Sequence, residues 1–199
     1  MYLLGVDIGS YSAKGVLLSQ AGEIVATATQ AHEMKVPGPG LAEHDADQDW
    51  WGGFCSVTRQ LLAQTGIDPK QIASVGCSGI GPCMLPVDAT GKALRAAVLY
   101  GIDTRAKDEI IELTQRYGAD FIMDHCGMSL TTQAVGPKML WLARSGLVGW
   151  FLLCHSPVAG ANGHRSQTNR QRGLQWHWPL HAARRCHGQG FAGRCFVWH

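Results

Sequence analysis

The sequence predicts an α/β domain with a mixed sheet, followed by a segment of different character. Through residue 145, apolar runs of strand length alternate with helical patterns: three strands, a helix, a strand, more strands and helices. This order is not a regular βαβ series. After residue 145 the composition changes, and no periodicity of 3.6 or 2.0 residues follows Cys154. We therefore divide the chain into residues 1–145 and residues 146–199.

The first three predicted strands form an antiparallel meander with a turn at Ala21 and Gly22. They cover residues 2–8, 14–19 and 23–30. Residues 35–50 are rich in proline and glycine and predict a loop. A helix then begins near Asp45 or Asp47, either of which can serve as its N-cap. The apolar residues at helical spacing in it are Trp50, Phe54, Val57, Leu61 and Leu62.

The rest of the first part predicts further strands and two more helices. Residues 72–81 indicate a buried strand that enters a glycine-rich turn, and two strands flank the turn at 88–91. A helix is predicted from Asp103 to about Tyr117, where Gly118 ends it. Another is predicted over residues 135–145, with Pro137 in its first turn.

The turn in "GVDIGSYSAKGVLL" (residues 5–18) has the residue types of a phosphate-binding site. The apolar run after it continues as a strand, so the motif is a hairpin tip and not a loop that opens a helix. Glycine permits close backbone approach, hydroxyls and a lysine attract phosphate, and a carboxylate suits hydrated magnesium. The candidates are Asp7, Gly9, Ser10, Ser12 and Lys14. The alternative is a hairpin whose turn is merely polar.

The composition argues against several classes of function. The first 145 residues carry all 15 acidic and 11 of the 17 basic side chains, so they show no basic footprint for nucleic acid. The seven cysteines have neither zinc-knuckle spacing nor a disulfide-scaffold pattern, which predicts free buried thiols in a reducing compartment. The first apolar run is interrupted by Asp7 and no run is long enough for a bilayer. We expect no signal peptide, no membrane association and a cytoplasmic location.

Four blocks resemble the N-terminal part of the FGGY carbohydrate kinases, in the order and spacing of that family. They are "LGVDIGSYSAKGVLLSQAGEIV", "AEHDADQDWW", "IASVGCSGIGPCMLPVDATGKALRAAVLYGIDTRA" and "CGMSLTTQAVGPKMLWLARS". Together they cover nearly all of residues 3–145, and overall the chain is similar to the xylulokinase-like branch. The resemblance implies a ribonuclease-H-like domain of the actin and hexokinase type, with sugar bound between two domains and ATP mostly on the second.

The resemblance also implies roles for individual residues. Asp7 matches the carboxylate that helps hold Mg²⁺, and Gly9, Ser10, Ser12 and Lys14 match the hairpin that faces the phosphates of ATP. The residues that match sugar-facing positions are Gly81, Pro82, Asp103, Arg105 and Gln133. Gly81 and Pro82 replace charged or histidine-containing pairs of relatives, and Tyr100 replaces the usual tryptophan. For Asp103 the alternative is helix N-capping, and for Arg105 it is pairing with nearby acids.

One part of the expected site is missing. Phosphoryl transfer to a sugar hydroxyl needs a carboxylate as general base, and in this family that aspartate follows the region matched here. We therefore expect a truncated kinase for a pentulose, such as xylulose or ribulose, or a related polyol, inactive alone, with relatives that form homodimers at full length. The alternatives are a non-catalytic remnant and a small interaction protein that uses a basic tail.

Residues 146–199 differ from the rest in kind. They contain six arginines and six of the nine histidines but no Asp, Glu, Lys, Ile, Met or Tyr. A frameshifted or otherwise scrambled end explains this bias, and a genuine Arg/His-rich tail is the alternative. His177 and His181, with nearby cysteines, are a weak zinc or nickel pattern, and the arginines allow non-specific contacts with nucleic acid.

Overall fold

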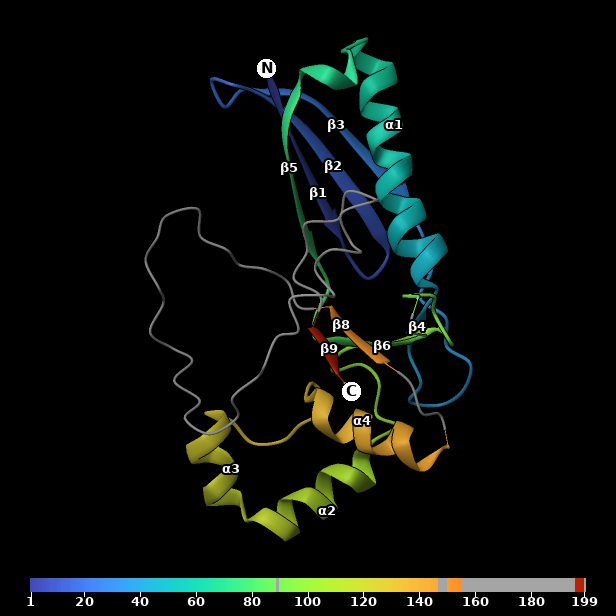
Figure 1. The fold of residues 1–199 in the computed structure, drawn as a ribbon, viewed down its shortest axis with the longest axis vertical. Helices are drawn as coiled ribbons and strands as arrows, with labels where there is room; N and C mark the ends of the chain where they lie inside the picture. Colours follow the sequence, from blue (N-terminus) through green and yellow to red (C-terminus); the bar gives the residue numbers. More distant parts are fainter. Residues whose placement is uncertain (89, 147–149, 155–195, 199) are drawn as a thin grey trace.

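A computed structural model describes residues 1–88, 90–146, 150–154 and 196–198 (Figure 1). The strands are β1 (Tyr2–Ile8), β2 (Ser12–Ser19), β3 (Ile24–Ala31), β4 (Glu43–His44), β5 (Ile72–Gly79), β6 (Cys83–Val87), β7 (Ala97–Val98), β8 (Trp150–Cys154) and β9 (Phe196–Trp198). The α-helices are α1 (Gly53–Thr65), α2 (Lys107–Tyr117), α3 (Ala119–Cys126) and α4 (Val135–Arg144), with a π-helical segment at Ala46–Gly52 and a 3₁₀ turn at Pro69–Gln71. The strands form two sheets, of order β3-β2-β1-β5 and β4-β7-β6-β8-β9.

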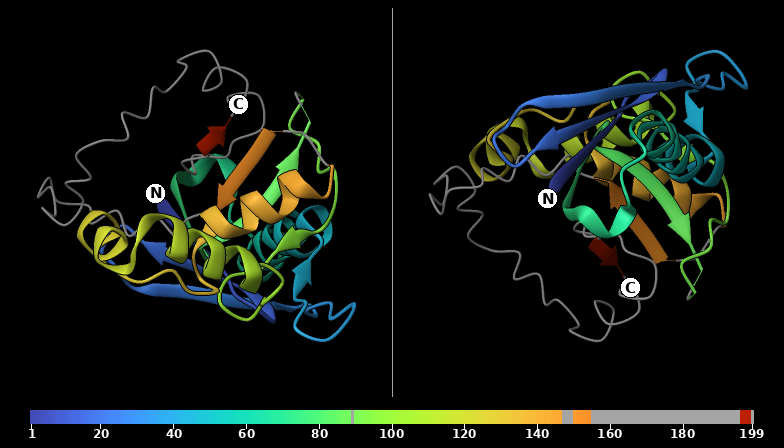
Figure 2. Two further views of the ribbon diagram at one scale, coloured as in Figure 1. Left: turned by 90° about the horizontal axis from the view of Figure 1, so that it is seen from below. Right: turned by 90° about the horizontal axis from the view of Figure 1, so that it is seen from above.

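The first sheet is mixed and is covered on one face by α1 (Figures 1 and 2). Strand β1 pairs antiparallel with β2 and parallel with β5. Its alternate residues Leu4, Val6 and Ile8 are buried in one core cluster with Val57 and Leu61 of α1. Because successive side chains of a strand point to opposite faces, the residues between them lie on the face away from α1.

A glycine lets α1 approach the sheet closely. A Cβ atom added at Gly15 of β2 would lie 2.9 Å from Cδ1 of Leu61 and 3.2 Å from Val57. Both of those side chains are fully buried, so they have little room to move aside. The close contact between β2 and α1 therefore depends on the absence of a side chain at this position.

The second sheet lies between the first sheet and helices α2, α3 and α4 (Figure 1). Leu142 of α4 is fully buried against Met84 of β6 and Val98 of β7. Arg144 at the end of α4 forms ion pairs with Glu109 and Glu112 of α2, which joins these two helices. The chain is thus an α/β structure with a mixed sheet, as the sequence predicts.

The predicted meander is confirmed. The predicted helix start near Asp45 is confirmed as well, although the first turns, Ala46–Gly52, are π-helical and α1 itself begins at Gly53. The side chain of Asp45 accepts hydrogen bonds from the amides of Asp47 and Gln48, both at 3.1 Å. These bonds satisfy amides of the first helical turn, which have no partner within the helix. The stop at Gly118 and the place of Pro137 in the first turn of α4 are confirmed as well.

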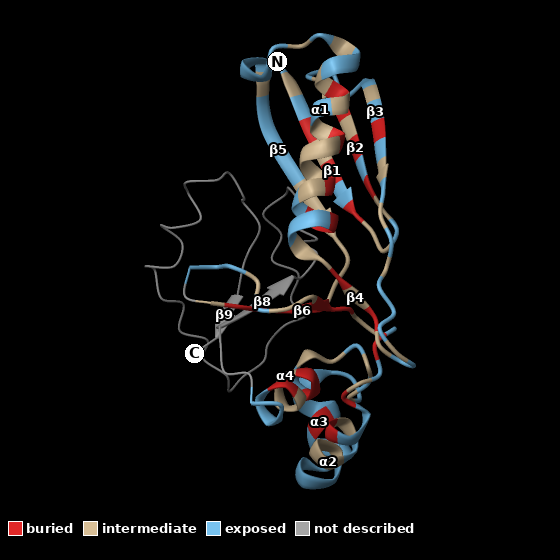
Figure 3. Cartoon of the chain, turned by 90° about the vertical axis from the view of Figure 1, so that its right-hand side faces the viewer, coloured by how far each residue is buried: buried red, intermediate tan, exposed pale blue. Residues whose placement is uncertain are grey.

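The strand predicted over residues 72–81 is present as β5, but the prediction that it is buried is wrong. Among the described residues β5 pairs with β1 alone, half of its residues are exposed and none is buried (Figure 3). Val75 is 47% exposed. An apolar run indicates a strand but does not report how many neighbours cover it, and here β5 is an edge strand.

Three elements differ from the sequence prediction. Helix α2 begins at Lys107 and not at Asp103, because the Asp103 carboxylate is engaged in a preceding turn. Gly118, with φ of 85°, separates α2 from a further helix, α3, which the sequence did not predict. Strand β4 has two residues in a segment predicted as loop, where it pairs with β7.

Two strands lie beyond residue 145, where the sequence predicts no regular structure. Strand β8 pairs antiparallel with β6, and β9 pairs with β8. The candidate metal ligands His177 and His181 lie outside the described residues. Among the free thiols in the described part of the chain, Cys83 is buried whereas Cys126 is exposed, so the prediction of buried thiols holds only in part. No helix in the described part of the chain is both long and apolar enough to cross a membrane.

The close packing at Gly15 gives a prediction. Gly15→Val should lower the free energy of unfolding by about 1–3 kcal/mol, because the added side chain overpacks the contact with α1. The control is Gly76→Val, since a Cβ at that position of β5 meets no atom within 4 Å. Urea unfolding followed by far-UV circular dichroism measures both, and equal loss in the two variants would contradict the packing argument.

Candidate active site

The hairpin between β1 and β2 is a tight turn closed by backbone hydrogen bonding. The amide of Gly9 donates to the carbonyl of Ser12 at 2.8 Å. A Cβ atom added at Gly9 would lie 3.2 Å from that carbonyl oxygen, so glycine allows the two arms to approach. Strand β2 follows directly, which confirms that the motif is a hairpin tip and not the start of a helix.

Three polar residues occupy neighbouring positions on three strands, on the sheet face away from α1. Asp7 of β1 lies directly opposite Lys14 of β2 in the antiparallel register and beside Ser78 of β5 in the parallel register. The hydroxyl of Ser78 donates to Oδ1 of Asp7 at 2.5 Å. Asp7 and Lys14 are both exposed and line a hollow of about 510 Å³. The sheet register therefore makes an acidic and a basic residue cross-strand neighbours on an open surface.

The residues around Asp7 fit a hydrated magnesium ion better than a fully protein-bound metal. Within the described residues no group of three or more His, Cys, Asp or Glu side chains could hold a metal ion. Mg²⁺ commonly keeps several waters and takes one or two carboxylates together with phosphate oxygens. Ser78 fixes the orientation of the Asp7 carboxylate, which retains acceptor capacity for a metal-bound water.

The predicted sugar-contacting turn lies beside the hairpin. The amide of Ile80 donates to the carbonyl of Ile8 at 2.8 Å, so the ends of β1 and β5 run together. Gly81 and Pro82 follow at once and are half-buried. Because β1 and β5 are parallel, both strands end at the same edge of the sheet, where ligands of open α/β sheets commonly bind.

A third segment reaches the hairpin through Tyr100. Its hydroxyl and the hydroxyl of Ser10 lie 2.9 Å apart and share a hydrogen bond. Gln133 lies next to this segment, since a Cβ added at Gly101 would be 2.8 Å from its Cγ atom. Gln133 is itself exposed. The structure thus brings the hairpin, the Gly81–Pro82 turn and the surroundings of Gln133 to one end of the first sheet.

Asp103 and Arg105 are buried in an ionic cluster. Asp103 has no exposed surface, and its carboxylate accepts hydrogen bonds from Arg105 and from the amide of Ala42. Arg105 also donates to Glu43 at 2.8 Å and lies over the ring of Trp141. Burial raises the pKa of Asp103, but the hydrogen bonds from Arg105 and Ala42 outweigh it and hold the pKa below its usual value.

This geometry favours a structural role for both residues. Asp103 is not the N-cap of α2, which is Ala106, and it joins the loop before that helix to the segment around Ala42. The alternative in which Arg105 pairs with nearby acids agrees with the cluster, although Arg105 and both of its acidic partners, Asp103 and Glu43, lie outside α2. Sugar binding by Asp103 and Arg105 stays a prediction that their burial does not favour.

Two histidines that the sequence did not indicate as site residues donate hydrogen bonds to the backbone of the hairpin. Nε2 of His32 donates to the carbonyl of Gly9, and Nε2 of His44 donates to the carbonyl of Ser10, each at 3.0 Å. The indole of Trp50 donates to Nδ1 of His44 at 3.0 Å, which fixes His44 as a neutral imidazole. No local pattern reveals these contacts, because each histidine is more than 20 positions away from its partner.

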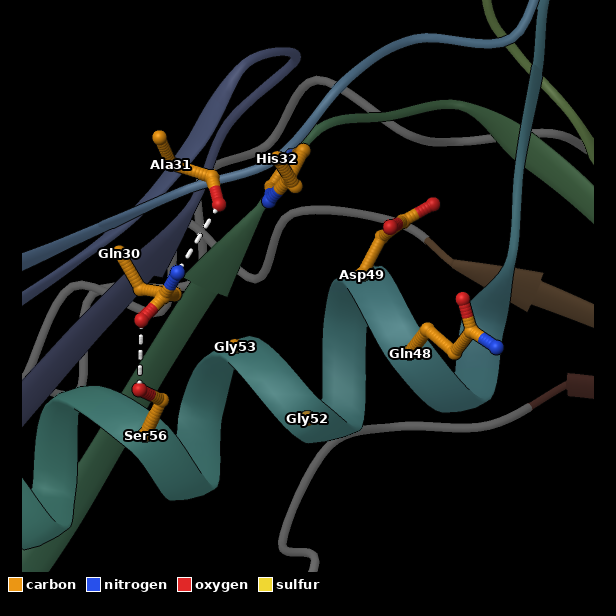
Figure 4. A pocket seen from close by; sticks show the side chains of 8 residues that line it. All are labelled: Gln30, Ala31, His32, Gln48, Asp49, Gly52, Gly53 and Ser56. Carbon is orange, nitrogen blue, oxygen red and sulfur yellow. Dashed lines mark hydrogen bonds between the residues drawn. The ribbon is translucent and has the colours of Figure 1, made fainter.

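A second hollow lies next to His32, between β3 and the start of α1 (Figure 4). It measures about 440 Å³. Ser56 and Gln30 both line it, and the hydroxyl of Ser56 donates a hydrogen bond of 2.7 Å to the side-chain oxygen of Gln30. Asp49 also lines it, and its carboxylate accepts from the amide of Asp45 at 2.7 Å. None of the predicted site residues lines this hollow.

Comparison with known proteins agrees with the four sequence blocks. The chain matches the FGGY family of carbohydrate kinases, N-terminal domain, over residues 2–146. The chain belongs to this family. The family resemblance and the ribonuclease-H-like fold predicted for an FGGY kinase are confirmed.

Relatives include both glycerol and xylulose kinases. A glycerol kinase from Methylobacterium radiotolerans is 32% identical over 142 residues, which cover 71% of this chain and 28% of the relative. A solved xylulose kinase from Rhodospirillum rubrum is 28% identical with a TM-score of 0.67, over 72% of this chain and 29% of that one. A xyloylose kinase from Brucella ovis is 26% identical with a TM-score of 0.67, over 73% and 30%. The chain spans less than a third of the length of these FGGY kinases.

His44 should make the stability of this FGGY domain depend on pH. Burial lowers the pKa of His44, as does the neighbouring His32, while Asp49 opposes the shift. Its contribution to stability is therefore present above its unfolded pKa of about 6.5 and is lost as the pH falls through the lowered folded value. Protonation also places a hydrogen on Nδ1, against the indole N–H of Trp50.

We expect His44→Gln to lose less stability than the wild type between pH 7.5 and pH 5. Thermal unfolding at each pH measures the difference. His125→Gln is the control, because His125 is exposed and bonds only within its own helix among the described contacts. Parallel pH profiles for wild type and His44→Gln would contradict the assignment.

Proposed function

We propose that this domain supplies the phosphate and magnesium half of an ATP-dependent sugar kinase site. The observation that carries the proposal is the register of β1, which sets Asp7 opposite Lys14 and beside Ser78 on one open face. Lys14 would bind phosphate oxygens of ATP, and Asp7 would hold Mg²⁺ through water. Catalysis of phosphoryl transfer depends largely on such positioning and charge neutralisation.

For the acceptor we propose a pentulose or a related polyol. Xylulose and glycerol kinases among the relatives support a small polyhydroxylated substrate as the class. Gly81, Pro82 and Gln133 lie at the end of the sheet near the hairpin. We expect these residues to contact the substrate. A turn of glycine and proline offers few side-chain donors, so we expect specificity to depend on other contacts as well.

We further propose that the 199-residue chain does not turn over alone. Of the two aspartates predicted in the site, Asp7 is committed to the metal in this scheme and Asp103 is buried and ion-paired. Neither is free to accept the proton of a sugar hydroxyl as general base. We also propose a cytoplasmic location, and homodimers for relatives at full length.

Nucleotide binding by the hairpin is the direct test. Mg²⁺ with a non-hydrolysable ATP analogue should shift the amide resonances of residues 7–14 in ¹⁵N-labelled protein. Lys14→Ala should weaken this binding about tenfold or more, since a charge-assisted contact contributes about 1.5–3 kcal/mol. The control is Lys70→Ala, because Lys70 is exposed and lies outside the hairpin region. Absence of shifts in the wild type would favour a non-catalytic remnant.

Turnover is tested separately. In a coupled assay for ADP release with glycerol, xylulose and ribulose, we expect no rate above the sugar-free background from the isolated chain. Robust turnover with any of the three sugars would overturn the proposed inactivity. It would also require a general base other than Asp7 and Asp103.

A further inference from the structure

We propose that Tyr100 is a positioning residue that orients the Ser10 hydroxyl toward phosphate and links the sugar-side segment to the hairpin. The inference rests on the proposed function, because it assigns the link to the same phosphate site. The link joins residues 90 positions apart in the chain, one in the hairpin and one in the segment after β7.

Hydrogen bonds from Lys138 and Asp103 fix the position of the backbone at Tyr100. Lys138 is 1% exposed, and its ammonium group donates to the carbonyls of Leu99 at 2.5 Å and Tyr100 at 2.9 Å. The amide of Asp103 donates to the same Tyr100 carbonyl at 3.0 Å. Burial lowers the pKa of Lys138 to about 8, and the nearby Asp103 and Cys83 favour its charged form. Tyr100 therefore extends its ring from a fixed backbone.

The hairpin side of the link is held as well. His32 and His44 bind the carbonyls of Gly9 and Ser10, so the backbone around Ser10 has little freedom. What remains free is rotation of the Ser10 side chain about its Cα–Cβ bond, and the hydrogen bond to Tyr100 restricts this rotation. The two hydroxyls thus meet between two anchored backbones.

Either hydroxyl can donate in this hydrogen bond, and the proposal requires Tyr100 to be the donor. A serine hydroxyl has one hydrogen to donate and two lone pairs to accept with. When the Tyr100 hydroxyl donates to Ser10, the serine hydrogen is free for a phosphate oxygen, and each bond in such a chain strengthens the other. Tyr100→Phe would leave the serine hydroxyl in place but without its fixed orientation.

The test compares Tyr100→Phe, Ser10→Ala and the double variant in the full chain. The control is Tyr11→Phe, since Tyr11 belongs to the same hairpin but is 62% exposed. The first measurement is the Kd for Mg²⁺ with the ATP analogue, from amide shifts. We expect each single variant to bind about two- to tenfold more weakly, the range for one neutral hydrogen bond. The double variant should bind no more weakly than Ser10→Ala.

Two results would overturn the link: an unchanged Kd in Tyr100→Phe, or losses in the two single variants that add fully in the double variant. A purely structural role of Tyr100 would not produce the non-additive pattern with Ser10. Thermal unfolding, expected to change no more in Tyr100→Phe than in Tyr11→Phe, identifies any variant that fails to fold.

A second measurement needs no nucleotide and separates this inference from the proposed function. Exchange of the Gly9 amide with solvent should be faster in Tyr100→Phe and Ser10→Ala than in Tyr11→Phe, because this amide closes the turn next to Ser10. If the wild type binds no nucleotide, the proposed function fails while faster exchange still supports the link. Equal exchange in Tyr100→Phe and Tyr11→Phe would overturn it.

Discussion

The register of β1 with its two neighbours is the constraint on which the rest of the structure depends. Burial of Leu4, Val6 and Ile8 against α1 requires one face of the strand to be apolar. Because side chains alternate, Asp7 must then lie on the opposite face. A slip by one residue would bury Asp7 and expose the core, so the hydrophobic core itself fixes the position of the candidate metal-binding carboxylate.

A second constraint is the cluster of buried charged side chains around Asp103. Glu43, Asp103 and Arg105 connect β4 with the loop before α2, and Arg105 lies over Trp141 of α4. Removing charges from water is costly, so such a cluster is stable only when each member keeps its partners. It therefore holds the loop after Tyr100 in one conformation, and this favours a fixed link to the hairpin.

The sequence predicts what depends on local pattern. Alternation identifies the meander, the side chain of Asp45 marks the start of the first helix, and the hairpin residues lie close together in the chain. It does not predict the exposure of β5 or the burial of Asp103, since both depend on which distant segments pack nearby. For the same reason it misses Ser78, which bonds to Asp7 across 71 positions. The sequence therefore predicts the hairpin of the candidate site but not the distant residues that hydrogen-bond to it.

The hydrogen bonds to the hairpin also determine which of its backbone groups are available to an anion. The Gly9 amide is used within the turn, and the carbonyls of Gly9 and Ser10 point toward histidines. In a trans peptide the C=O and the following N–H point in opposite directions. The amides of Ser10 and Tyr11 therefore point away from His32 and His44, in the manner of backbone sites that attract anions. By binding these carbonyls, His32 and His44 favour an anion at the hairpin without contacting it.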